Sequence, residues 1–113
     1  MAVVAGRTGE RDVSLLLDTG SNYTVVPVEV LEAIGCSPAS SRDHVRITTA
    51  DGMLIAPRVR CQAFTVFGHR IDAAELIAHD LPFSGPIDGL LGMDLLVPLN
   101  GRIDTAAVCI DIV

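Results

Sequence analysis

An aspartate at the end of an apolar run is the first place where this sequence can support chemistry. Asp18 follows three leucines and precedes Thr19 and Gly20, in the stretch LLLDTGSNYTVVP. The leucines predict a buried strand, Gly20 permits a backbone turn, and an apolar, β-prone pattern resumes at Thr24. The carboxylate therefore lies at a tight turn between two buried segments. A charge in such surroundings is costly unless it is used, which makes Asp18 a candidate functional residue.

The same aspartate also has a purely structural interpretation. An Asp side chain at a turn can accept hydrogen bonds from nearby backbone amides, and an isolated Asp-Thr-Gly tripeptide is weak evidence of function. Asp88 and Asp94 are two further carboxylates beside apolar segments. Asp88 precedes a predicted buried strand and Asp94 opens a predicted helix, where a carboxylate suits the helix dipole. We expect both of them to be structural.

The composition bounds the fold and the partners. The length of 113 residues predicts a single domain over 1–113. Of these residues, 50% are hydrophobic and only 4% are aromatic. An interior filled by Val, Ile and Leu favours strands. The formal net charge is −6, and the eight cationic residues form no basic run. Nucleic acid is therefore not expected as a partner, because phosphate binding needs clustered Lys and Arg.

The cysteine spacing and the hydropathy of the sequence bear on where in the cell the protein is expected. Cys36, Cys61 and Cys109 are odd in number and widely spaced, which favours reduced thiols over a disulfide framework. No zinc-binding spacing occurs, and we expect neither a metal nor a cofactor. The sequence shows no signal peptide and no apolar segment long enough to span a membrane. We expect a cytoplasmic location, or a soluble domain excised from a larger or anchored protein.

The elements that must position Asp18 are mainly strands. The 13–18 strand is expected to be central and buried on both faces. Pro57 implies an edge or a bulge in a long strand. The segment 71–78 is ambiguous between helix and strand, and its place after a turn favours strand. The predicted strands span 2–6, 13–18, 44–50, 53–68, 71–78 and 90–91, with one or two more within 102–113.

Turn and helix signals separate these strands. A helix is predicted to begin at Pro27 and to stop at Gly35, and a short helix follows Gly92. Asp51-Gly52 is a strong signal for a hairpin tip, and a second hairpin turn is expected at 67–70.

Three of these features, in this order, resemble the retropepsin-like aspartic proteases, in particular the cellular and bacterial members. The family pattern is hydrophobic-hydrophobic-Asp-Thr/Ser-Gly, then a flap hairpin, then hydrophobic-hydrophobic-Gly before a helix. The matching stretches here are Leu16–Ser21, Thr48–Ala56 and Leu90–Leu95. The resemblance covers nearly the whole chain. It implies an all-β, retropepsin-like acid protease barrel with one or two short helices and a flap hairpin near residues 48–56.

The sequence departs from the viral members of the family at three points. Met93 stands where viral enzymes usually carry an arginine, and the predicted flap contains fewer glycines. Only residues 1–12 precede the 13–18 strand, so we do not expect the N-terminal strand that viral enzymes add to their dimer sheet.

The resemblance implies an aspartic endopeptidase, a hydrolase that uses no metal. Because the chain carries one Asp-Thr-Gly, a homodimer must supply two Asp18 carboxylates, one ionised and one protonated. By the same resemblance, Thr19 braces its counterpart across the dimer axis and Gly20 lets the substrate backbone approach. Ser21 would hydrogen-bond near the carboxylate.

The resemblance also implies a substrate: a protein or peptide with hydrophobic residues near the cut, held under the flap. The rival hypothesis is a non-catalytic dimerisation or peptide-binding module with the same fold. A second alternative is a self-processing protease cut from a precursor. The residues assigned to substrate binding are Leu16, Ser21, Ala50, Asp51, Gly52, Ile87 and Leu90.

Overall fold

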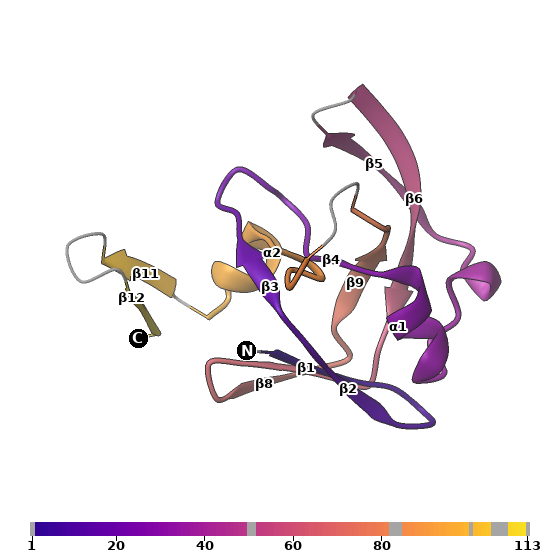
Figure 1. Cartoon of the computed structure of the whole chain (residues 1–113), viewed down its shortest axis with the longest axis horizontal. Helices are drawn as coiled ribbons and strands as arrows, with labels where there is room; N and C mark the ends of the chain where they lie inside the picture. Colours follow the sequence, from indigo (N-terminus) through magenta and orange to yellow (C-terminus); the bar gives the residue numbers. More distant parts are fainter. Residues whose placement is uncertain (1, 50–51, 82–84, 100, 105–108, 113) are drawn as a thin grey trace.

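Strands dominate the chain, whose computed structural model describes residues 2–49, 52–81, 85–99, 101–104 and 109–112 (Figure 1). The all-β fold class with two short helices is confirmed. The helices are α1 (Val28–Ala33) and α2 (Met93–Leu96), with a 3₁₀ turn η1 (Pro38–Ser40). The strands are β1 (Ala2–Ala5), β2 (Glu10–Val13), β3 (Leu15–Leu17), β4 (Val25–Val26), β5 (His44–Thr49), β6 (Gly52–Arg60), β7 (Ala63–Val66), β8 (His69–Asp72), β9 (Glu75–Ala78), β10 (Gly89–Leu91), β11 (Gly101–Asp104) and β12 (Cys109–Ile112).

The described strands form open sheets rather than a closed barrel. A four-stranded antiparallel sheet has the order β2-β1-β7-β8. A six-stranded mixed sheet has the order β3-β10-β4-β9-β6-β5, in which β3–β10 and β4–β9 are parallel pairs. Strands β11 and β12 form a separate antiparallel hairpin that extends away from the body of the molecule (Figure 1).

Strand β10 lies between β3 and β4, the two strands that flank the Asp18 turn. This insertion requires close backbone approach. A Cβ atom on Gly89 would collide with the carbonyl oxygen of Val25, and one on Gly92 would collide with that of Tyr23. Glycine is therefore required at both ends of β10, which explains the glycine of the hydrophobic-hydrophobic-Gly pattern.

The prediction of a central 13–18 strand is wrong. The segment is divided between β2 and β3, and among the described strands β3 lies at the edge of its sheet with β10 as its partner. Leu15 and Leu17 pack against the main core, whereas Leu16 points to the opposite face and is 49% exposed. The alternation of a strand places neighbouring side chains on opposite faces, so three consecutive leucines need not all be buried.

The predicted long strand over 53–68 is interrupted. It consists of β6 and β7, separated at Cys61 and Gln62. Pro57 is the last residue of β6 that pairs with β5, and the pairing of β6 with β9 starts at Arg58. Proline is tolerated there because the ladder with β9 has not yet begun, which accounts for the edge character predicted at Pro57.

Several local predictions are confirmed. Helix α1 lies between Pro27 and Gly35. The 71–78 segment is strand rather than helix, but it is not one strand: β8 ends at Asp72, β9 begins at Glu75, and the two belong to different sheets. Phe67 and Gly68 both have positive φ, at 52° and 76°, in the turn between β7 and β8. Thr49 pairs with Gly52 at the end of the β5–β6 hairpin, and the predicted tip residues Ala50 and Asp51 lie outside the described residues.

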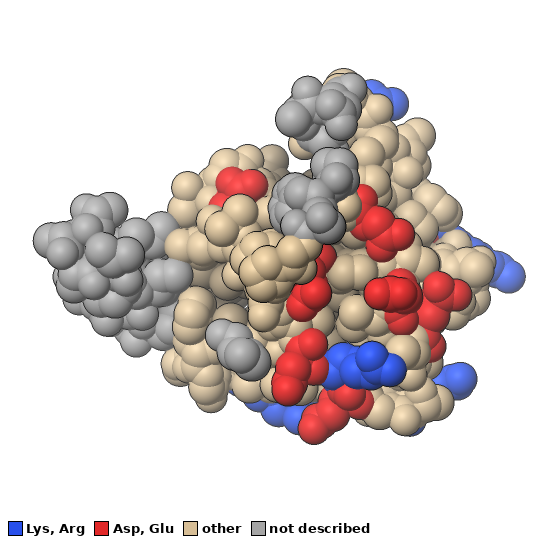
Figure 2. Space-filling model, in the orientation of Figure 1, with Lys and Arg blue, Asp and Glu red and all other residues tan. Residues whose placement is uncertain are grey.

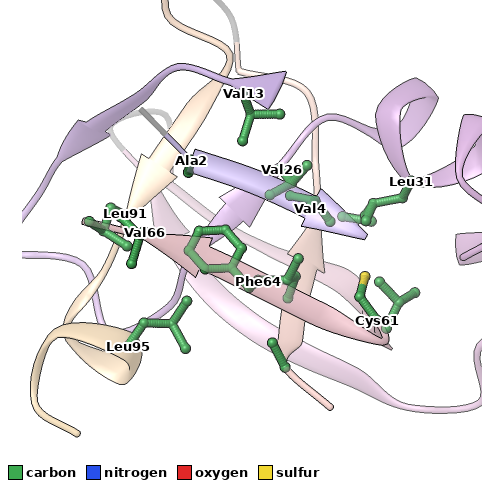
Figure 3. Packing of buried hydrophobic residues seen from close by; sticks show 14 of the residues in the cluster. Ala2, Val4, Val13, Val26, Leu31, Cys61, Phe64, Val66, Leu91 and Leu95 are labelled. Carbon is green, nitrogen blue, oxygen red and sulfur yellow. The ribbon is translucent and has the colours of Figure 1, made fainter. Parts of the chain in front are cut away.

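Two hydrophobic clusters occupy opposite faces of the six-stranded sheet. The larger one fills the space against the four-stranded sheet and contains Phe64, Val4 and Leu31, all with no exposed surface (Figure 3). The smaller one packs the inward side of the β5–β6 hairpin against the sheet. Its buried members are Val25, Val45, Ile47, Ala56 and Ile77.

Truncation of Phe64 tests the larger cluster. Phe64→Ala should lower the free energy of unfolding by about 3–5 kcal/mol, because it removes the largest fully buried side chain among the described residues and leaves a cavity. Urea unfolding measures the change. The matched control is Phe67→Ala at the exposed end of the same hairpin, which should cost about 1 kcal/mol or less. Equal losses in the two variants would contradict this description of the core.

Candidate active site

Asp18 lies where β3 leaves the sheet. Its backbone N–H donates to the carbonyl oxygen of Leu91 at 3.0 Å, which extends the parallel β3–β10 pairing by one residue. The backbone then turns, and the N–H of Ser21 donates to the carbonyl oxygen of Asp18 at 3.1 Å. Asp18 is half-buried, and Thr19 and Gly20 are exposed. The turn predicted from the sequence is therefore present, and one side of it is open to another molecule.

One oxygen of the Asp18 carboxylate is held by the turn itself. Oδ1 accepts a hydrogen bond from the N–H of Gly20 at 3.0 Å. A Cβ atom on Gly20 would lie 3.3 Å from this oxygen, so glycine keeps the approach to the carboxylate open. Among the described residues, Oδ2 has no hydrogen-bond partner. The carboxylate is thus oriented by the backbone while one of its oxygens stays available.

Ser21 braces the loop rather than the carboxylate. Its hydroxyl donates to the carbonyl oxygen of Tyr23 at 2.7 Å and accepts from the N–H of Tyr23 at 3.4 Å. Its carbonyl oxygen accepts from the N–H of Met93 at 2.9 Å. The short hydroxyl side chain is occupied by the local turn, so it does not make the hydrogen bond near Asp18 that the resemblance implied.

Thr24 and Asp94 form a polar network behind the loop that the sequence reasoning did not identify. Thr24 is fully buried. Its N–H donates to Oδ2 of Asp94 at 3.1 Å, and its hydroxyl donates to Oδ1 at 2.8 Å. The same hydroxyl accepts from the N–H of Gly92 at 3.1 Å. The network joins the residue before β4 to the start of α2, and so fixes the Thr24 end of the loop that carries Asp18.

Two opposing effects act on the pKa of the Asp94 carboxyl group. Burial raises the pKa of Asp94 above its usual range, while the two hydrogen bonds from Thr24 act to lower it. In the sequence, the position of Asp94 beside apolar residues was the signal for its structural role. Its partner Thr24 could not be inferred, because the two residues are 70 positions apart.

Asp88 also has a structural partner. Its Oδ2 accepts from the N–H of Ser14 at 2.8 Å, and its own N–H donates to the carbonyl oxygen of Ser14 at 2.7 Å. This pair of bonds precedes the β3–β10 ladder. Asp88 and Asp94 thus both have the structural surroundings expected from their positions in the sequence.

Leu16 and Leu90 share the face of the sheet that lies under the β5–β6 hairpin. They are register partners, and the row continues through Val25 to Ile77. Leu90 is half-buried and packs with Leu54 and other partly buried residues against the smaller cluster. This face offers apolar side chains that are not fully covered. The half-buried residues at this cluster are Tyr23, Leu54, Leu81 and Leu90.

The other residues assigned to substrate are less closely associated with this face. Ile87 is half-buried and belongs to neither described hydrophobic cluster. Gly52 is exposed, has a φ of 120° and begins β6. Ala50 and Asp51 lie outside the described residues.

On the face shown in Figure 2, acidic side chains gather toward the lower right, with arginines among them or along the margin. Within the described ranges, no group of three or more His, Cys, Asp or Glu side chains could hold a metal ion. A search of the described residues also finds no helix with the length and hydropathy needed to cross a membrane.

Comparison with known proteins agrees with this geometry. Residues 4–95 match the aspartyl protease family, and the chain belongs to it. This match confirms the resemblance to retropepsin-like aspartic proteases. No curated protein is similar enough in sequence to match the chain.

Two solved structures have a similar fold. One is a retropepsin-like aspartic protease from Rickettsia conorii, with a TM-score of 0.57, 21% identity, and 92% of each chain covered. The other is the retroviral protease-like domain of Ddi1 from Leishmania major, with a TM-score of 0.54 and 15% identity. That alignment covers 98% of this chain and 84% of the other. At these identities, the likeness establishes the fold.

Removing the Thr24 hydroxyl tests the network. Thr24→Val keeps the branched shape but leaves the Gly92 N–H without its acceptor and the Asp94 carboxylate without one donor. The free energy of unfolding should fall by about 1–3 kcal/mol. Urea unfolding measures the loss. Thr48→Val, at an exposed position on β5, is the control and should have little effect; a similar result at both positions would refute the role of the network.

The pKa of Asp94 predicts a pH dependence of stability. Because the folded-state pKa lies above the ordinary value of 3.8, this residue contributes stability below that value and loses it as pH rises through the folded pKa. Asp94→Asn cannot titrate. The stability of the wild type relative to Asp94→Asn should therefore decrease from about pH 3 to about pH 7 in urea unfolding. A difference that stays constant or grows with pH would contradict the assignment; Asp12→Asn, at an exposed position, controls for the loss of a charge.

Proposed function

We propose that this chain is an aspartic endopeptidase whose active form is a homodimer, with one Asp18 from each protomer in the catalytic pair. The observation that carries the proposal is the Asp18 carboxylate, which is oriented by the Gly20 N–H and keeps Oδ2 without a partner among the described residues. The family membership supports the same chemistry.

The arrangement of the other carboxylates supports a dimer. A water-activating pair needs two carboxyl groups that share a proton. Asp94 is bound to Thr24 through both oxygens, and Asp88 is bound to the N–H of Ser14. Neither is available beside Asp18, so a second copy of the chain is the natural source of the second acid.

The β11–β12 hairpin is a second support for dimerisation. Its two strands pair with each other over Gly101–Asp104 and Cys109–Ile112. Among the described residues, no other strand pairs with either outer edge. Unpaired edges with free backbone N–H and C=O groups can add strands from another chain. The hairpin extends from the body beside α2, where a partner could reach it (Figure 1).

The proposed chemistry assigns a distinct task to each part of the site. The ionised Asp18 accepts a proton from the water that attacks the peptide carbonyl. The protonated Asp18 of the other protomer donates to the developing oxyanion, and the leaving nitrogen then takes up a proton. Thr19, which is exposed beside Asp18, is proposed to contact its counterpart across the two-fold axis.

The substrate is proposed to be an extended peptide with hydrophobic residues near the cut. The face that carries Leu16 and Leu90 is only partly covered by the β5–β6 hairpin, and its exposed apolar area suits such side chains. The hairpin, including its tip near Ala50, Asp51 and Gly52, would close over the peptide and exclude water.

Peptide cleavage by wild type and Asp18→Asn is the direct test. Wild type should cut a diverse peptide mixture between about pH 4 and 7, and its specific activity should fall on dilution as dimers dissociate. Asp18→Asn keeps the shape of the side chain but removes the base, so cutting should drop at least about a hundredfold. Product formation is measured by mass spectrometry.

A matched variant and a mass measurement separate the possible outcomes. Asp12→Asn makes the same chemical change at an exposed position on β2 and should leave cleavage unchanged. Cutting that survives in Asp18→Asn would reject Asp18 as the catalytic group. A folded dimer that binds peptides without cutting them would instead favour the peptide-binding module, and analytical ultracentrifugation identifies that state.

A further inference from the structure

Two of the three cysteines meet where the end of α1 approaches the end of β6. Cys36 follows α1, and its N–H donates to the carbonyl oxygen of Leu31 at 2.8 Å. Cys61 follows β6, and its N–H donates to the carbonyl oxygen of Ala74 at 2.9 Å. The Cys36 side chain packs against the hydrophobic cluster that contains Cys61, and its thiol lies near enough to the Cys61 thiol to raise the pKa of that group. Both are free thiols in this structure.

The backbone around β1 holds these thiols in place. A Cβ atom on Gly6 would lie 2.8 Å from the Cys36 Sγ atom, so the main chain there passes directly beside the sulfur. The preceding residue, Ala5, accepts a hydrogen bond from the N–H of Gln62 at 3.0 Å. The end of β1 therefore contacts the segments that carry both cysteines, and the fold itself holds these two segments close together.

The two cysteines differ in their exposure to solvent. Cys61 is only 2% exposed and belongs to the larger hydrophobic cluster, which Figure 3 shows around it. Cys36 is half-buried and lines a shallow surface pocket of about 220 Å³. Serines 37, 40 and 41 and the side chains of Arg58 and Arg60 also line this pocket. A small polar reagent can thus reach Cys36 directly, whereas Cys61 is shielded.

We propose that Cys36 and Cys61 are a modification site at which a low-molecular-weight disulfide, such as glutathione disulfide, forms a reversible internal disulfide bond. The packing of Cys36 against the cluster that contains Cys61 and the pocket beside Cys36 carry the proposal. It is independent of any catalytic activity of the chain.

The reaction balances in two thiol–disulfide exchanges. The Cys36 thiolate attacks one sulfur of the small disulfide, the S–S bond breaks, and the departing thiolate takes up a proton. The Cys61 sulfur then loses its proton and attacks the Cys36 sulfur of this mixed disulfide. The second small thiolate departs and is protonated. Two protein thiols are oxidised, and one small disulfide is reduced to two thiols.

The second exchange sets the rate. Burial, followed by the nearby Cys36 thiol, raises the pKa of the Cys61 thiol, so little of it is ionised at neutral pH. The mixed disulfide at Cys36 should therefore accumulate first and convert to the internal bond more rapidly as pH rises.

The bond would enclose the whole β5–β6 hairpin. The closed loop runs from Cys36 through η1, β5 and β6 to Cys61. Its closure would fasten the end of β6 to the end of α1 and restrict the unfolded chain. The oxidised protein should melt roughly 10 °C higher than the reduced protein.

The test uses the full chain with Cys109→Ser, so that these two thiols alone remain. The protein is incubated folded, at about pH 8, with glutathione disulfide at millimolar concentration, and aliquots are alkylated with N-ethylmaleimide. Intact mass spectrometry should show a glutathione adduct that gives way to a species lacking two hydrogens, and peptide mapping should link Cys36 to Cys61. The wild-type chain mapped in the same way checks that the Cys109→Ser substitution has not altered the pairing.

Two single-thiol variants give the contrasting results. Cys61→Ala in the same background should stop at a stable glutathione adduct on Cys36. Cys36→Ser should leave Cys61 unmodified for at least about tenfold longer than Cys36 takes to react. A glutathione adduct that persists when both cysteines are present, modification of Cys61 in the absence of Cys36, or an internal bond formed only in urea would overturn the proposal. An oxidised protein that melts no higher than the reduced one would overturn the fastening of the hairpin.

Discussion

The insertion of β10 between β3 and β4 is the constraint on which the site depends. Strands β3 and β4 are joined by the Asp18 loop, yet each pairs with β10 rather than with the other. The loop must therefore arch over the end of β10. Its backbone is fixed there by the Leu91 carbonyl and by the Met93 N–H. Glycines at 89 and 92 make this approach possible, because any side chain would meet the main chain of β4 or of the loop.

The buried polar network resolves a problem that the insertion creates. Loop residues pressed against the core carry backbone groups that need partners. Thr24 and Asp94 supply them, and no buried side-chain nitrogen or oxygen in the described residues lacks a hydrogen bond. The cost is a partly buried carboxylate whose pKa rises on burial. Asp94 is thereby committed to holding the loop, which leaves Asp18 as the carboxylate directed outward.

Local sequence patterns correctly predicted the features that depend only on residues close together in the sequence. The turn at Asp18, helix α1, the strand β5 and the turn at Phe67 and Gly68 all follow from short-range chemistry. The sequence patterns misplaced β3 as a central strand because β10, its partner among the described strands, lies far along the chain. They also missed Thr24, whose hydroxyl is indistinguishable in the sequence from any strand threonine until Asp94 and Gly92 are brought beside it.

The same long-range pairing determines when the site can form during folding. Strand β3 is held by β10, and the bonds between Ser14 and Asp88 span 74 residues. Contacts with such large sequence separation form late, because the entropy of closing the intervening chain must be lost first. During synthesis, the Asp18 loop emerges from the ribosome before β10 and α2. Its hydrogen bonds to Leu91 and Met93 can form only after these elements follow. A partly made chain thus has the Asp-Thr-Gly sequence without its geometry, which can form only once β10 and α2 have followed.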